Sequence, residues 1–123
     1  MKAQITFEYL ILFLVFISII SIVLFAIVAI KSSSEKSMEL IQFNSIAEKI
    51  NSRADSVCSL GSGNKIAVYS DFEINLTYHE FGIEYNYNNF SIAKKTLCKT
   101  EGDHSIKGNI LIENRNGIVY IEK

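Results

Sequence analysis

Hydrophobic residues fill the first quarter of the chain, whereas the remainder alternates between apolar and polar positions. No charged residue occurs from Tyr9 to Ile30, and the side chains between them are almost all aliphatic or aromatic. About twenty helical residues span ~30 Å, the thickness of the hydrocarbon layer of a bilayer. Because such a helix is apolar on every face, no face is suited to water. The pattern predicts a helix that enters a membrane.

A secretory signal peptide is the alternative interpretation of this segment. Such a peptide has an apolar run of about 7–15 residues, which is followed by a cleavage site of small residues. The run here is longer, and the stretch from Lys31 to Lys36 that follows it contains no such site. We therefore expect the mature protein to keep the apolar segment.

Beyond Ile30, the spacing of apolar residues predicts that the helix continues as an amphipathic helix over residues 31–60. The apolar side chains recur at intervals of three and four, as they do on one helix face: they are Phe43, Ile46, Ala47, Ile50, Ala54, Val57 and Cys58. The chain has no proline, and no glycine precedes Gly61. Glycine readily adopts the conformation that ends a helix, so we expect the helix to stop at Gly61–Asn64.

After Gly63 the hydrophobic period falls to two, which is typical of half-buried strands. One alternating set is Phe72, Ile74, Leu76 and Tyr78, and a second is Phe81, Ile83, Tyr85 and Tyr87. Residues 66–69 form a further strand or the start of the first, and Asn88–Asn89 is a turn that leads to residues 90–92.

The clearest hairpin signal lies near the end of the sequence. Asn109–Glu113 and Ile118–Glu122 flank Asn116-Gly117, a pair that adopts positive φ at little cost. We expect four or five antiparallel strands in residues 64–123, with the helical stripe from Ile46 to Cys58 packed on them. The predicted fold is α+β: a long N-terminal hydrophobic helix followed by a small antiparallel β-sheet head domain.

Composition and charge exclude several classes of function. The 123 residues carry a net charge of −1, and Lys and Arg are not clustered as nucleic-acid binding requires. No nucleophile–base pair, phosphate loop or calcium loop is present, so we predict neither an enzyme nor a cofactor. A zinc site built from His79, His104 and the cysteines would lack the closely spaced ligand pairs typical of such sites. We interpret both histidines as surface residues and predict no metal.

Cys58 and Cys98 admit two interpretations. If the head lies outside the cell they form one disulfide, worth ~4 kcal/mol in the chain-entropy model. The alternative is two buried free thiols. We prefer the disulfide, which would join the end of the helix to the sheet.

Two N-glycosylation acceptor tripeptides lie in the predicted head: Asn75-Leu-Thr77 and Asn89-Phe-Ser91. Asn75 falls on the polar phase of its strand, so we expect its side chain to face away from the core. Chance occurrence without modification is the alternative at both sites. The strand tyrosines are interpreted as partly buried side chains whose hydroxyl reaches water.

Glu8 is the residue that the membrane interpretation explains least well. A carboxylate on a lipid-exposed helix costs about 2–3 kcal/mol at the bilayer centre and less near an interface. Glu8 either marks the edge of the membrane segment or requires a positive partner once the helix leaves lipid. An α-amino group exposed by cleavage just upstream would be such a partner.

Gln4, Thr6, Glu8 and Leu12 resemble the Q-x-S-x-E-x-x-x-L pattern of archaeal type IV pilin precursors with a class III signal sequence. Thr6 replaces the serine of the pattern and keeps its hydroxyl group. In that family a membrane aspartic prepilin peptidase cuts immediately before the glutamine. The resemblance implies cleavage between Ala3 and Gln4, which removes residues 1–3 as a leader. Residues 4–30 would then be the membrane segment of the precursor and the filament core after assembly.

The resemblance also implies a function, partners and a location. The chain would be a pilin subunit of an extracellular surface filament, with the cytoplasmic membrane as the location of its precursor. Its partners would be other pilin subunits, the prepilin peptidase, the pilus assembly machinery and, before assembly, membrane lipid. Glu8 would offset the new amino group of Gln4 on an adjacent subunit. The alternatives are a single-pass membrane-anchored surface protein with a small β binding domain, or a minor or pseudopilin subunit.

Overall fold

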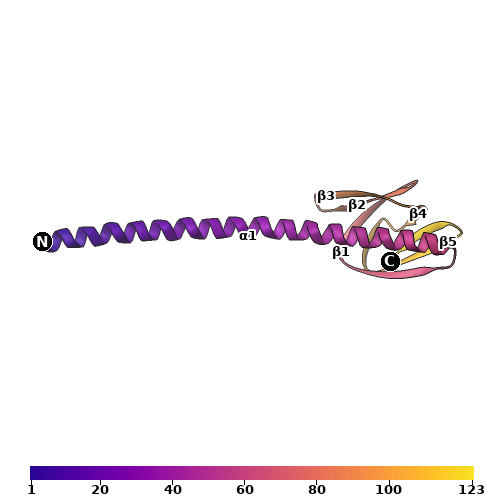
Figure 1. Ribbon diagram of the computed structural model, residues 1–123, viewed down its shortest axis with the longest axis horizontal. Coiled ribbons are helices and arrows are strands. Elements are labelled where there is room, and N and C mark those ends of the chain that lie inside the picture. Colours follow the sequence, from indigo (N-terminus) through magenta and orange to yellow (C-terminus); the bar gives the residue numbers. More distant parts are fainter. The chain divides into compact units, whose positions relative to one another are not determined.

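The computed structural model describes residues 1–123 apart from the side chain of Lys2. One helix, α1 (Lys2–Leu60), precedes six strands (Figure 1): β1 (Lys65–His79), β2 (Gly82–Tyr87), β3 (Phe90–Lys95), β4 (Lys99–Gly102), β5 (Ser105–Arg115) and β6 (Ile118–Glu122). The chain divides into two compact units, Met1–Glu39 and Leu40–Lys123. We call the first the N-terminal helix unit and the second the head. The α+β fold that the hydrophobic pattern predicts is confirmed.

The strands of the head form one sheet in the order β3-β2-β1-β5-β6-β4. Neighbouring strands are antiparallel except for β4 and β6, which are parallel. The expectation of four or five strands, all antiparallel, was therefore wrong in number and in one pairing. Strand β4 escaped notice because its four residues, Lys-Thr-Glu-Gly, contain no apolar side chain to show a period.

Residues 66–69 and 72–78 belong to the single long strand β1, whose register against β5 shifts between Ser70 and Ile74. Ser70 is buried at this irregularity, where its hydroxyl donates to the carbonyl of Phe72 (3.0 Å) and accepts from the Phe72 amide (3.2 Å). Buried backbone groups need hydrogen-bond partners. At the bulge, the Ser70 side chain therefore supplies the backbone hydrogen bonds that a neighbouring strand supplies elsewhere in the sheet.

Tight turns connect the antiparallel strands. Asn116 and Gly117 both have positive φ in the β5–β6 turn, as the Asn-Gly signal predicts, and Asn88 has a φ of 50° in the β2–β3 turn. Pairing of His79 with Gly82 leaves Phe81 in the β1–β2 turn, where its side chain is 60% exposed. The prediction that Phe81 begins a half-buried strand was wrong, because β1 continues to His79 and the turn lies later in the chain than the hydrophobic alternation suggests.

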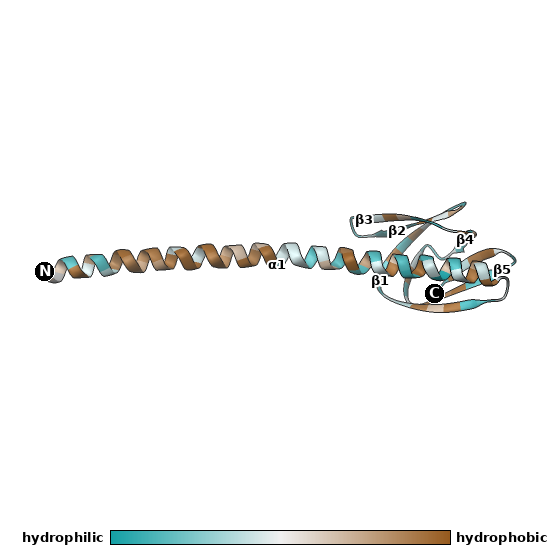
Figure 2. Ribbon diagram, in the orientation of Figure 1, coloured by the Kyte–Doolittle hydropathy of each residue, from teal (hydrophilic) through white to brown (hydrophobic). Residues whose placement is uncertain are grey.

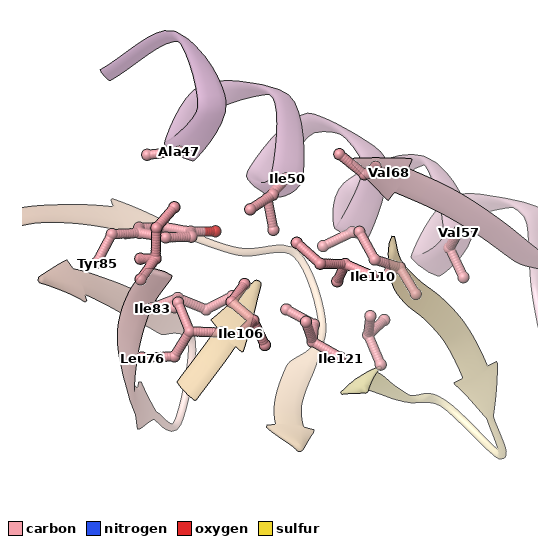
Figure 3. Close-up of a cluster of buried hydrophobic side chains, with 14 of the residues drawn as sticks. Ala47, Ile50, Val57, Val68, Leu76, Ile83, Tyr85, Ile106, Ile110 and Ile121 are labelled. Carbon is pink, nitrogen blue, oxygen red and sulfur yellow. The ribbon is translucent and has the colours of Figure 1, made fainter. Parts of the chain in front are cut away.

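The core of the head lies between the sheet and one face of α1 (Figure 3). The helix contributes five fully buried side chains at the predicted spacing: Phe43, Ala47, Ile50, Ala54 and Val57. They pack against isoleucines from several strands, including Ile74, Ile106 and Ile110. Burying one large aliphatic side chain contributes about 1.5–3 kcal/mol, so this stripe is the main reason that the head end of α1 stays on the sheet.

Gly102 gives a test of the β4–β6 pairing that the sequence did not reveal. It has a φ of 144°, and an added Cβ would overlap the carbonyl oxygen of Ile121 on β6. We expect Gly102→Ala to lower the free energy of unfolding by about 3 kcal/mol, measured by denaturant unfolding of the detergent-solubilised protein.

Gly108→Ala is the matched control. Gly108 also has positive φ (84°), but an added Cβ there meets nothing within 4 Å. Its cost should be only the backbone strain of about 1–2 kcal/mol. Equal losses for the two variants would contradict the close approach of β4 to β6.

Candidate functional site

Hydrophobic residues make up most of the N-terminal helix unit as far as Ile30 (Figure 2), and their side chains are exposed on every face of the helix. Its large side chains from Ile5 to Ile30 are each between 42% and 78% exposed, for example Ile20 and Phe25. The most apolar stretch has a mean hydropathy of 3.3, and by length and composition the helix can cross a membrane. Soluble proteins rarely expose an apolar surface this large and contiguous. Lipid or another protein must therefore cover it.

The two serines within the apolar segment leave no hydroxyl unpaired. Ser18 donates to the carbonyl of Leu14 at 2.8 Å, and Ser21 donates to that of Ile17 at 2.9 Å. A polar group without a hydrogen-bond partner is costly in an apolar environment. Because both hydroxyls bond to their own helix, the serines are compatible with lipid and with a packed protein interior.

The four residues that resemble the pilin signal pattern lie at the start of α1. The Ile5 amide donates to the Met1 carbonyl at 3.2 Å, so the helix already includes the Ala3–Gln4 peptide bond. Gln4 and Glu8 are four residues apart and therefore lie on one helix face, with Leu12 one turn further. All three side chains are exposed, as is that of Thr6.

Glu8 is the only acidic residue between Met1 and Ile30. It makes no ion pair with any residue that the structure describes. Its carboxylate is therefore free to accept hydrogen bonds from a cation outside the chain. The interpretation in which Glu8 awaits a positive partner depends on this accessibility.

At the other end of α1, Asn114 of β5 satisfies the helix carbonyls. Its buried side-chain amide donates to the carbonyls of Val57 (3.2 Å) and Cys58 (3.4 Å), and its side-chain oxygen accepts from the Gly117 amide (2.9 Å). The last carbonyls of a helix have no partner within the helix. One asparagine thus links the helix terminus to the β5–β6 turn. Its place beside the Asn116-Gly117 turn gave no indication in the sequence of this contact with the helix.

A disulfide joins Cys58 of α1 to Cys98, as predicted, with a Cα–Cα distance of 5.9 Å. Three polar contacts lie beside it along the helix. Lys94 pairs with Glu48 at 3.9 Å, the Asn51 amide donates to the Lys95 carbonyl at 3.0 Å, and Asp55 accepts from the Leu97 amide at 2.9 Å. We call this row of four contacts the helix–strand clasp.

In the sequence, Asn51 and Asp55 are two of the polar residues between the apolar positions of the amphipathic helix. They were missed because polar residues at the edge of a buried stripe look the same in sequence as fully solvated ones. One signal was present in the sequence: Asn51, Asp55 and Cys58 are spaced by four and then three residues, which places them along the same side of the helix.

The two glycosylation acceptors are exposed in different settings. Asn75 lies on the outward face of β1, between Asn86 of β2 and Ser105 of β5. Asn89 lies in the β2–β3 turn, and the hydroxyl of Ser91, the third residue of its tripeptide, donates to Glu84 at 2.7 Å. The expectation that Asn75 faces away from the core is confirmed.

The tyrosines and histidines of the head make structural contacts. Tyr85 is fully buried, and Tyr78 donates its hydroxyl to the Asp103 carbonyl at 2.8 Å. Burial raises the pKa of both phenols, because the charged phenolate is disfavoured away from water. His79 lies 3.6 Å from Glu84, and His104 Nδ1 lies 3.2 Å from the Leu76 carbonyl. Among the described side chains, no three potential metal ligands converge.

Comparisons with protein-family models, with curated proteins and with solved structures found no match for this chain. Its function must therefore be inferred from its own residues and contacts. The feature with most functional content is the exposed apolar helix with Gln4 and Glu8 at its start, since the polar side chains of the head described above make contacts within the head.

Asn114→Ala tests the link between the helix end and the sheet. The variant leaves the buried Val57 carbonyl and the Gly117 amide without a partner, whereas the Cys58 carbonyl still accepts from the Gly61 amide at 3.3 Å. We expect a loss of about 2–3 kcal/mol in the free energy of unfolding, measured by denaturant titration. Asn109→Ala on the exposed face of β5 is the control and should change it by less than about 0.5 kcal/mol. A similarly small loss for Asn114→Ala would show that the helix end is not held in this way.

Proposed function

We propose that this chain is a structural subunit, a pilin, of an archaeal type IV pilus-like surface filament. It is made as a precursor in the cytoplasmic membrane, cleaved between Ala3 and Gln4, and polymerised outside the cell through its N-terminal helix. The observation that carries the proposal is a helix whose apolar side chains are exposed all round, with the Gln4–Glu8 motif at its start.

An exposed apolar helix can be covered either by lipid or by other helices. Here lipid covers the helix first, and helices of other subunits cover it after assembly. In the precursor, lipid covers the segment from Tyr9 to Ile30. In the filament, the same side chains face neighbouring subunits, and burial of so much apolar surface favours a polymer that is hard to dissociate. Contacts between different faces of identical subunits generate a helical filament when the rotation from one subunit to the next does not close a ring.

Glu8 has a defined role in this scheme. Cleavage before Gln4 creates a positively charged α-amino group at the start of the mature helix. Once both groups leave the membrane interface for an apolar filament core, each requires a partner of opposite charge. The carboxylate of Glu8 pairs with the amino group of an adjacent subunit and so sets the axial position of one helix against the next.

The disulfide supports a location of the head outside the cytoplasm. Disulfides form and persist in oxidising environments and are rare in the reducing cytosol. A head that carries the Cys58–Cys98 bond and is attached to a membrane helix fits a surface protein. This observation is shared by the alternative function, a permanent surface anchor, which needs no cleavage before Gln4.

N-terminal mass analysis of filaments sheared from cells separates the two functions. The pilin proposal predicts a subunit that begins at Gln4, present in the sheared filament fraction. An anchor would stay with the membranes and keep residues 1–3. A sheared filament whose subunits still begin at Met1 or Lys2 would contradict the cleavage step.

Glu8→Ala tests the assembly role directly. The variant should insert in the membrane as the wild type does, because the change only makes the segment more apolar. Filament yield should fall on the order of a hundredfold, since an unpartnered buried charge costs about 3 kcal/mol or more. Glu80→Ala, which removes an exposed carboxylate from the β1–β2 turn, is the control and should assemble normally. Normal filaments from Glu8→Ala would contradict the proposed pairing of Glu8 with the amino group of Gln4.

A further inference from the structure

The charged stretch directly after the apolar segment is a second feature of the N-terminal helix unit. Lys31, Glu35, Lys36 and Glu39 are all exposed, and we call residues 31–39 the collar. The collar contains two positive and two negative side chains, so its charges cancel. None of the four makes an ion pair with a residue that the structure describes.

The spacing of these charges gives little benefit to the helix that carries them. An ion pair four residues apart is most favourable when the glutamate precedes the lysine, whereas Lys31 precedes Glu35. Glu35 and Glu39 are also four residues apart, and like charges at this spacing repel. Lys36 and Glu39 are three residues apart and could pair, but neither they nor Lys31 and Glu35 form an ion pair among the described residues.

Apolar side chains continue into the collar on one face. A groove on the helix surface is lined by Ile27, Ile30, Lys31, Ser34, Glu35 and Met38. Ile30 is 68% exposed and Met38 is 61% exposed, so neither is covered within the chain. A surface complementary to this groove must be apolar at the level of Ile30 and must offer both signs of charge just beyond it.

We propose that the collar is an interface between copies of this chain, in which lysines of one collar pair with glutamates of the next. The inference rests on the proposed function, because it requires helices of neighbouring subunits to run side by side. A second copy of this region supplies such a surface, because it carries the same apolar side chains and charges of both signs. Between parallel helices, a shift of three to four residues, about 5–6 Å, brings Glu35 of one copy near Lys31 of the other and Glu39 near Lys36.

Lipid headgroups are the competing cover for this region. Anionic headgroups attract clusters of Lys and Arg. A collar with equal numbers of both charges has no such preference, whereas it is complementary to a second copy of itself. The balance of charges therefore favours the protein partner.

Charge inversion tests the proposal in full-length protein. An acidic collar is made by Lys31→Glu with Lys36→Glu, and a basic collar by Glu35→Lys with Glu39→Lys. Each variant alone brings like charges together, so we expect at least a tenfold lower yield of sheared filaments. Coexpression of the two variants should restore the yield and give filaments that contain both. Lys49→Glu with Arg53→Glu inverts two exposed charges in the head portion of α1 and should assemble normally.

Each subunit must first be shown to be made, oriented and folded. External protease should reach the head, and a non-reducing gel should show the Cys58–Cys98 bond in both collar variants. Normal assembly of either variant alone would overturn the proposal, as would a failure of coexpression to restore filaments from correctly oriented subunits.

A second measurement requires no variant. Wild-type filaments grown from a mixture of isotopically light and heavy subunits would be treated with a carbodiimide, which joins paired amines and carboxylates. Mixed light–heavy peptides linking Lys31 or Lys36 to Glu35 or Glu39 are expected, and their absence would count against the interface even if a variant is misoriented. Wild-type cells without any filament would instead contradict the proposed function, so the two failures are distinguishable.

Discussion

The structure depends on one constraint: the apolar side chains of the N-terminal helix cannot remain in water. Every large side chain from Ile5 to Ile30 is exposed within the chain, and nothing in that unit is available to cover them. The two serine hydroxyls already donate hydrogen bonds to carbonyls of their own helix, so the segment is compatible with either lipid or protein around it. A segment with this property can move from one apolar environment to the other without refolding.

The head is subject to a different constraint, because it must bury part of the same helix and still present a polar surface to water. It does so by placing only one face of α1, from Phe43 to Val57, against a sheet whose inner face is dominated by isoleucine. The helix–strand clasp and Asn114 then fix the edge and the end of that helix by polar and covalent contacts. The two units thus differ in how their apolar side chains are covered. Those of the head are buried within the chain, whereas those of the N-terminal helix unit require lipid or another protein.

Patterns with a regular period were predictable from the sequence, and contacts between distant residues were not. The helical stripe ending at Val57, the Asn116-Gly117 turn and the Cys58–Cys98 pair were all found correctly. Strand β4 was missed because it is short, polar and paired in parallel with β6. The roles of Asn114, Asn51 and Asp55 depend on segments that folding brings together, so neighbouring residues gave no indication of them. The resemblance around Glu8 is a property of the sequence alone, since the structure shows only an exposed carboxylate there.

The disulfide has a mechanical consequence for a protein that is held by its helix. Tension applied between α1 and the C-terminal strands would pass from Cys58 directly to Cys98, across a sequence separation of 40 residues. Strands β1, β2 and β3 all lie inside that covalent loop, so tension along the backbone would bypass them. Under force, β4, β5 and β6 could be drawn out into an extended chain, whereas the disulfide limits how far the segment from β1 to β3 can be stretched.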